Sequence, residues 1–134
     1  MDRRWHRAVK TGDRATVRAL LAEGADPDGR DRYGQTGLML AAFAGHGGLV
    51  ADLVHAGARL DVTAKYGLSA LMLAVVAGHP DIARNLARVG ADRTSRGHGP
   101  RGFAGKTAAD LARDRGLTAL ADELAPPPAQ DAEA

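Results

Sequence analysis

Residues 100–107 carry side chains of the kind that bind phosphate, in an order close to that of a phosphate-binding loop. The sequence is Pro-Arg-Gly-Phe-Ala-Gly-Lys-Thr. A phosphate-binding loop follows the pattern Gly-x-x-x-x-Gly-Lys-Ser/Thr, in which backbone N–H groups surround the phosphates. Here Pro100 takes the place of the first glycine, and Gly99 stands one position too early. No strand pattern precedes the segment, so we expect neither a nucleotide site nor phosphotransferase activity.

The histidines and serines offer little further chemistry. His46 and His79 occupy equivalent positions 33 residues apart, but Leu117 stands at the next equivalent position. Structural zinc sites take four ligands, mostly cysteine and histidine, and the sequence contains no cysteine. The only serines are Ser69 and Ser95, and neither belongs to a recognisable set of nucleophile, base and orienting group. We therefore expect no metal, no cofactor and no enzymatic activity.

The elements that carry these residues repeat along the chain. Residues 33–46 return as residues 66–79, and residues 105–116 form a looser third copy. Between 31–63 and 64–96, 12 of 33 positions are identical without a gap. A fixed period of this length indicates a solenoid, in which each unit covers the apolar face of its neighbour.

Within each unit the pattern predicts two helices, joined by a tight turn and followed by an extended loop. Thr36 and Ser69 stand where an N-cap side chain accepts a backbone N–H of the first turn. Pro80 falls at the first position of a second helix, where its missing N–H has no consequence. Gly57 and Gly90 stand where the second helices end.

The repeats predict one all-α domain over residues 1–125. Its first unit has predicted helices over 3–11 and 14–23, with Trp5 in the core, and serves as a capping repeat. Its last unit contains an insertion of about five residues, in the loop around 96–102. The predicted division is 1–30 (N-terminal cap), 31–63, 64–96, 97–125 (C-terminal repeat) and 126–134 (disordered tail by composition).

This pattern resembles the ankyrin repeat family. The matching residues are Gly34, Thr36, Leu38, Ala41, Gly45, His46, Leu53, Gly57 and Ala58, their counterparts Gly67, Ser69, Leu71, Ala74, Gly78, His79, Leu86, Gly90 and Ala91, and the ending 105–112. The resemblance implies L-shaped repeats with projecting finger loops, and histidines that tie one loop to the next. Three positions depart from the family. Gly37 and Ala70 replace a proline, and Met39 and Met72 replace a histidine whose hydrogen bonds are therefore lost. Asp52 and Asn85 replace a leucine and are expected to be half exposed.

The resemblance also implies where a partner binds, because ankyrin proteins generally use the finger tips and the concave side of the first helices. The implied positions are Arg32, Tyr33, Gln35, Phe43, Lys65, Tyr66, Leu68, Val76, Arg101, Phe103, Asp114 and Arg115, together with Ala44, Ala77 and Ala104. Four of the five aromatic residues fall in this set. Aromatic and basic residues are typical interface anchors, but the finger aromatics could equally pack the loops against each other, and both interpretations stay open.

We therefore expect a small stand-alone, non-enzymatic protein-binding module, acting as an adaptor, an inhibitor or an antidote to one partner. The alternative is nucleic-acid or anionic-surface binding through Arg93, Arg96, Arg101 and the N-terminal arginines, although the net charge of +2 gives it little support. No segment is apolar enough to span a membrane, and the N-terminus does not resemble a secretory signal. We expect a cytoplasmic monomer, and the Ala- and Arg-rich composition suggests a high-GC bacterium.

Overall fold

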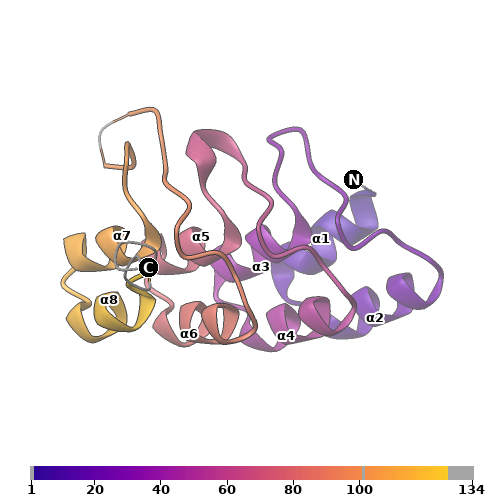
Figure 1. The fold of residues 1–134 in the computed structure, drawn as a ribbon. Helices are drawn as coiled ribbons and strands as arrows, with labels where there is room; N and C mark the ends of the chain where they lie inside the picture. The colour runs from indigo at the N-terminus through magenta and orange to yellow at the C-terminus, as the bar shows by residue number, and fades with distance from the viewer. Residues whose placement is uncertain (1, 101, 127–134) are drawn as a thin grey trace, which may run out of the picture.

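The computed structural model describes residues 2–100 and 102–126. Within these residues the chain forms four pairs of helices that stack in two rows, with loops projecting on one side (Figure 1). The inner row is α1 (Arg3–Thr11), α3 (Gly37–Ala44), α5 (Ala70–Val76) and α7 (Ala108–Asp114). The outer row is α2 (Arg14–Ala22), α4 (Gly47–His55), α6 (Pro80–Arg88) and α8 (Thr118–Leu124). The predicted all-α repeat solenoid is confirmed.

The projecting loops contain little regular structure. An isolated antiparallel bridge between Arg30 and Thr36 closes the first loop. The second loop contains a single 3₁₀ turn, η1 (Lys65–Gly67). We propose that each helix pair with its loop corresponds to one of the predicted repeat units. Of the predicted disordered tail, only Pro126 belongs to the described residues.

Buried hydroxyl groups start three of the inner helices. The side chains of Thr36, Ser69 and Thr107 accept the backbone N–H groups three residues ahead, each at 3.3 Å. All three residues are buried, so these hydrogen bonds satisfy donors that water cannot reach. At α7 the Asp110 carboxylate also accepts the Thr107 N–H, which completes a capping box.

Histidines tie the inner helices of neighbouring pairs together. His46 Nε2 donates to the Lys10 carbonyl oxygen at 3.0 Å, and His79 Nε2 donates to the Phe43 carbonyl oxygen at 3.1 Å. Gly45 precedes His46 in the left-handed conformation, at φ 85°, and the ring of His79 lies against its α-carbon. A side chain there would strain the backbone and meet the imidazole, so glycine is required. These bonds are the ties that the family resemblance implies.

The last tie is made by a different residue. The position equivalent to these histidines is Leu117, which cannot donate a hydrogen bond. Arg115 Nε instead donates to the Val76 carbonyl oxygen at 3.0 Å, and Val76 is equivalent to Phe43 and Lys10 in the repeat. The series of ties therefore continues across all four pairs.

Trp5 is buried in the core of the first pair, as predicted. It packs against Gly37, a contact that was not predicted from the sequence. Trp5 is 2% exposed, and its indole lies over the first residue of α3. A Cβ added at Gly37 would lie 3.0 Å from Trp5 Nε1 and 3.3 Å from Val9 Cγ1. Gly37 therefore makes room for the indole, which explains why the proline of the family is absent.

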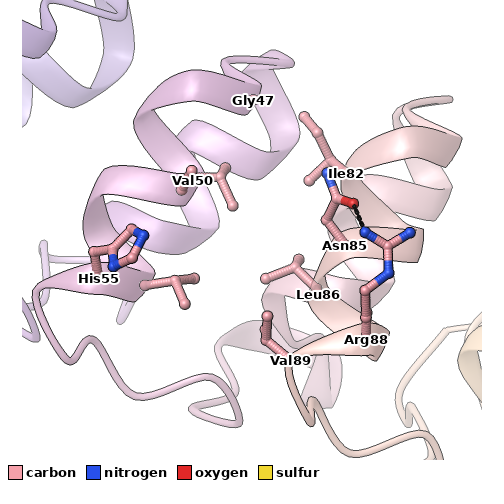
Figure 2. Close-up of a pocket in the computed structure, with 10 residues that line it drawn as sticks. Gly47, Val50, His55, Ile82, Asn85, Leu86, Arg88 and Val89 are labelled. Atoms are coloured by element: carbon pink, nitrogen blue, oxygen red, sulfur yellow. Dashed lines mark hydrogen bonds between the residues drawn. The ribbon is translucent and has the colours of Figure 1, made fainter.

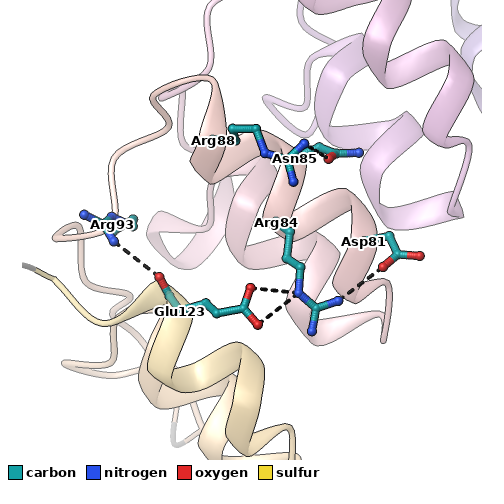
Figure 3. Close-up of polar contacts among 6 residues, drawn as sticks. All are labelled: Asp81, Arg84, Asn85, Arg88, Arg93 and Glu123. Carbon is teal, nitrogen blue, oxygen red and sulfur yellow. Dashed lines mark hydrogen bonds and ion pairs between the residues drawn. The ribbon is translucent and has the colours of Figure 1, made fainter.

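Arginine–carboxylate pairs link two of the three outer-row junctions. Arg14 donates from Nε and Nη2 to the two carboxylate oxygens of Asp52, at 2.7 and 3.0 Å, and Arg18 lies 3.5 Å away. These hydrogen bonds from Arg14 hold the pKa of Asp52 below its ordinary value. Between α6 and α8, Arg84 Nε donates to Glu123 at 2.9 Å (Figure 3). Asp52 is half-buried as expected, whereas Asn85 is exposed.

Candidate functional site

The concave face consists of the exposed sides of α1, α3, α5 and α7 together with the projecting loops (Figure 1). Most of the predicted partner-binding residues lie there. Arg101 lies outside the described residues, so nothing is placed for it. The remaining positions divide into exposed side chains and side chains that the fold itself uses.

Tyr33 and Phe43 are the most exposed aromatic residues of this face. Tyr33 is 64% exposed at the tip of the first loop, and Phe43 is 52% exposed on α3. The Asp31 carboxylate fixes the loop by accepting the backbone N–H groups of Tyr33 and Gln35, each at 2.9 Å. The Arg32 guanidinium lies 5.4 Å from the centre of the Tyr33 ring, which is a cation–π arrangement.

Tyr66 and Phe103, by contrast, pack against each other. Their ring centroids are 5.7 Å apart and their planes differ by 26°, so the rings are stacked. Lys65 Nζ lies 5.0 Å from the centre of the Tyr66 ring. The His98 N–H donates to the Tyr66 carbonyl oxygen at 2.9 Å, so the inserted loop folds onto the loop before it. These two aromatics join loops, whereas no ring among the described residues stacks on Tyr33.

An apolar hollow and a basic hollow adjoin the exposed aromatics. Leu40, Phe43 and Leu73 line a small apolar hollow between α3 and α5. Arg3 and Lys10 line a more polar one, with Tyr33 and Arg32 at its other side. Near its base, His6 Nε2 lies 3.7 Å from an Asp31 carboxylate oxygen.

Leu68, one of the implied partner-binding positions, is not open to a partner. It is 7% exposed and belongs to the core, because its apolar side chain turns inward directly after η1 ends at Gly67. Gln35, at the same position of the preceding repeat, is half-buried. Val76 is also half-buried, and its carbonyl oxygen is occupied by Arg115.

The last repeat presents charges that already have partners. Lys106 pairs with Asp114, and Arg115 is held by the Val76 carbonyl. Thr107 is the N-cap of α7, so the segment that resembles a phosphate-binding loop is a loop end and a helix start.

Two of the arginines proposed for nucleic-acid binding, Arg93 and Arg96, are also engaged by the fold. Arg93 Nη1 donates to the carbonyl oxygens of Glu123 and Ala125, at 3.3 and 3.2 Å (Figure 3). Arg96 Nη1 donates to the Gly105 carbonyl oxygen at 2.6 Å. Both side chains hold loops in place, which is a structural role for their charge.

Arg3, Lys10, Leu40 and Leu73, from the first three repeats, also line these hollows and were not predicted from the sequence. Lys10 stands at the repeat position of Phe43, and Leu40 and Leu73 are equivalent to each other. Arg3 precedes Trp5 by two positions on the same helix. Aligning the first repeat position by position with the second places Lys10 at the position of Phe43. The structure supports this alignment, because the carbonyl oxygens of Lys10 and Phe43 both accept a hydrogen bond from a histidine.

Across the described ranges, no three histidine, cysteine, aspartate or glutamate side chains group as metal ligands, and no helix is long and apolar enough to cross a membrane.

A family model described as "Ankyrin repeats (3 copies)" matches residues 5–96, which is more than half of the chain. No curated protein matches the sequence. Ankyrin repeats are generally protein–protein interaction modules and are typically not enzymes. The matched repeats, the helix pairs and the histidine ties agree, and the chain belongs to the ankyrin repeat family.

Proposed function

We propose that the concave face captures one protein partner, and that the protein acts as an adaptor, inhibitor or antidote for it. The proposal places this event in the cytoplasm, where a chain without cysteine needs no oxidising environment to fold. In this proposal the protein is a monomer and binds one partner molecule, because the fold has one continuous concave face for contact.

The main support for this proposal is the exposure of Tyr33 and Phe43. Single exposed apolar side chains are common on folded proteins, whereas exposed apolar side chains that gather on one face mark an interaction site. Tyr33 and Phe43, with Val89, are the exposed large hydrophobic residues among those described, and the two aromatics lie on one face. Neither is needed to close the core, so both are free to anchor a partner.

The positive charge beside these aromatics indicates that the partner carries an acidic group. Arg3, Lys10 and Arg32 surround Tyr33, and no ion pair of theirs is found within the described ranges. A partner that places a carboxylate here and an apolar side chain over Leu40 and Phe43 would satisfy both hollows.

Affinity capture from native cells, read by mass spectrometry, tests the proposal. The baits are the wild-type chain, the double variant Tyr33→Ala/Phe43→Ala, and Asp122→Ala as a control at an exposed residue of the outer row. We expect a partner that the wild type and Asp122→Ala recover equally and the double variant loses. With the purified partner, the double variant should weaken the Kd by roughly a hundredfold, since central aromatic anchors contribute ~2 kcal/mol or more.

Two outcomes would contradict the proposal. One is equal recovery of every partner by all three baits. The other is tight binding of DNA or RNA that falls steeply with salt above about 50 mM, which would favour the anionic-surface alternative.

A further inference from the structure

The three junctions of the outer row are not built alike. Positions 18, 51 and 84 are equivalent in the repeat, as are positions 52, 85 and 123. At the first junction Arg18 and Arg14 meet Asp52, and at the third Arg84 meets Glu123. At the middle junction, between α4 and α6, the equivalent residues are Ala51 and Asn85. The middle junction therefore lacks both partners of the ion pair that its neighbours possess.

An apolar groove takes the place of this ion pair. It lies between α4 and α6 and has a volume of about 210 Å³ (Figure 2). Its lining includes the aliphatic side chains of Val50, Val54, Ile82, Leu86 and Val89. Val89 is 50% exposed, which leaves an aliphatic surface open to solvent on the side opposite the concave face.

The rim of the groove is basic. Arg88 and His55 occupy the same repeat position, at the ends of α6 and α4. Arg88 Nη1 donates to the amide oxygen of Asn85 at 3.0 Å, and this amide is neutral (Figures 2 and 3). No carboxylate lines the groove among the described residues, so no lining group neutralises the guanidinium. The arginines of the neighbouring junctions, in contrast, face carboxylates.

We propose that the α4–α6 groove is a second docking site, which binds an acidic amphipathic segment of a partner protein. An aliphatic or aromatic side chain of this segment lies over Ile82, Leu86 and Val89. An adjacent carboxylate pairs with Arg88, at the end of the groove where both helices end. Apolar contact supplies the affinity, and the charge orients the segment. The site is separate from the concave face and does not depend on it.

A second copy of this chain fits the groove poorly. The other exposed large hydrophobic residues, Tyr33 and Phe43, lie beside the cations Arg32 and Lys10. Placing either aromatic in the groove would bring these cations towards Arg88, and like charges at an interface oppose association. The charge of the rim therefore selects an acidic partner over self-association.

A displayed library of random peptides of about twelve residues, which reach ~40 Å when extended, tests this assignment on the whole chain. Peptides selected on the wild-type protein are synthesised, and their Kd is measured by fluorescence anisotropy against four variants. Val89→Asp and Arg88→Glu alter the groove. Ala22→Asp places the same charge at the exposed end of α2, which does not line the groove, and Tyr33→Ala/Phe43→Ala alters the concave face. Circular dichroism confirms that each variant is folded.

We expect selected peptides that join an aliphatic or aromatic residue to Asp or Glu. Val89→Asp and Arg88→Glu should each weaken their binding by roughly tenfold or more, while Ala22→Asp and the concave double variant leave it unchanged. Three results would overturn the inference: no peptide sensitive to Val89→Asp, binders that Arg88→Glu does not weaken, or a wild-type dimer in light scattering that Val89→Asp dissociates. The last would identify a second copy as the occupant.

Discussion

At the scale of single residues, Trp5 and Gly37 form a matched pair. The indole of Trp5 is buried against α3, and its Nε1 makes no hydrogen bond among the described residues. The missing side chain of Gly37 lets the ring approach this closely. A large residue in the first repeat is thus accommodated by the smallest residue in the second.

This pairing predicts an unusual response to a helix-stabilising substitution. Replacing glycine by alanine inside a helix normally stabilises it by ~0.5–1 kcal/mol. At Gly37 the new Cβ would lie 3.0 Å from the indole, so we expect Gly37→Ala to reduce the free energy of unfolding by about 1–3 kcal/mol. Chemical denaturation measures the change.

Gly47 provides the matched control, because it is the first residue of α4 as Gly37 is of α3. Its nearest neighbour beyond the helix is Ile82 Cγ1, at 3.7 Å from an added Cβ, which is an ordinary contact. Gly47→Ala should leave stability unchanged or raise it. Equal effects of the two substitutions would show that Trp5 does not require the glycine.

At the scale of helices, ion pairs join two of the three outer-row junctions, and hydrogen bonds to backbone carbonyl oxygens join the inner row. Asp52 illustrates the first case, since two arginines of α2 converge on its carboxylate from the neighbouring helix. Both arginines are partly exposed, so solvent screens the pair and its net contribution is modest. The contribution nevertheless depends on pH in a definite direction.

Acid should remove the stabilisation that Asp52 provides. Its pKa in the folded protein is lowered, chiefly by the hydrogen bond from Arg14, so the unfolded chain takes up the proton first as pH falls. The contribution is complete above about pH 5 and is lost as pH falls through the folded-state pKa. We expect Asp52→Asn to lower Tm at pH 7, with a difference from the wild type that shrinks towards acid.

Asp122→Asn is the control for this titration, because Asp122 is an exposed residue of α8. It changes the net charge equally and should alter Tm little at any pH. A constant difference between Asp52→Asn and the wild type from pH 7 down to acid would contradict the linkage.

The helices themselves follow from local sequence, and this explains which features could be predicted. The first helix spans Arg3–Thr11, as its N-cap and periodicity indicate, and the caps at Thr36 and Ser69 are present. These features depend on neighbours within a few residues. The buried position of Leu68 was not predictable in this way, because the path of the second loop decides it.

Contacts between repeats were predictable only where two repeats are alike. The histidine ties recur at one position, whereas leucine occupies this position in the last repeat and the donor is Arg115, two residues earlier. The stacking of Tyr66 on Phe103 also depends on how the inserted loop folds. Of the candidate site, the exposure of Phe43 was anticipated, and that of Tyr33 agrees with one of two interpretations that the sequence left open. The basic residues of α1 that line the adjoining hollow were not anticipated.

At the scale of the whole molecule, the fold is a linear array in which each pair of helices contacts its neighbours. The stability of such an array is approximately a sum of unit terms and interface terms, so an end unit depends on a single interface. For α7 and α8 that interface includes the bond from Arg115 to the Val76 carbonyl.

Removing this last tie should therefore loosen one end and not the centre. We expect Arg115→Met to increase amide hydrogen exchange in α7 and α8 by roughly five- to tenfold, the effect of losing one hydrogen bond of ~1 kcal/mol, with α1 to α4 unchanged. Arg113→Met is the control, since Arg113 pairs with Asp110 inside α7. Faster exchange throughout the chain would mean that the array unfolds as one unit.

The unlike middle junction also has a mechanical consequence. A curved rod that bends further towards its concave side must lengthen along its convex side, where the outer helices lie. Arg14–Asp52 and Arg84–Glu123 resist such stretching at two junctions, whereas no ion pair joins α4 and α6 among the described residues. We therefore expect the rod to bend most readily between the second and third repeats. A segment bound in the groove between α4 and α6 would then limit this bending.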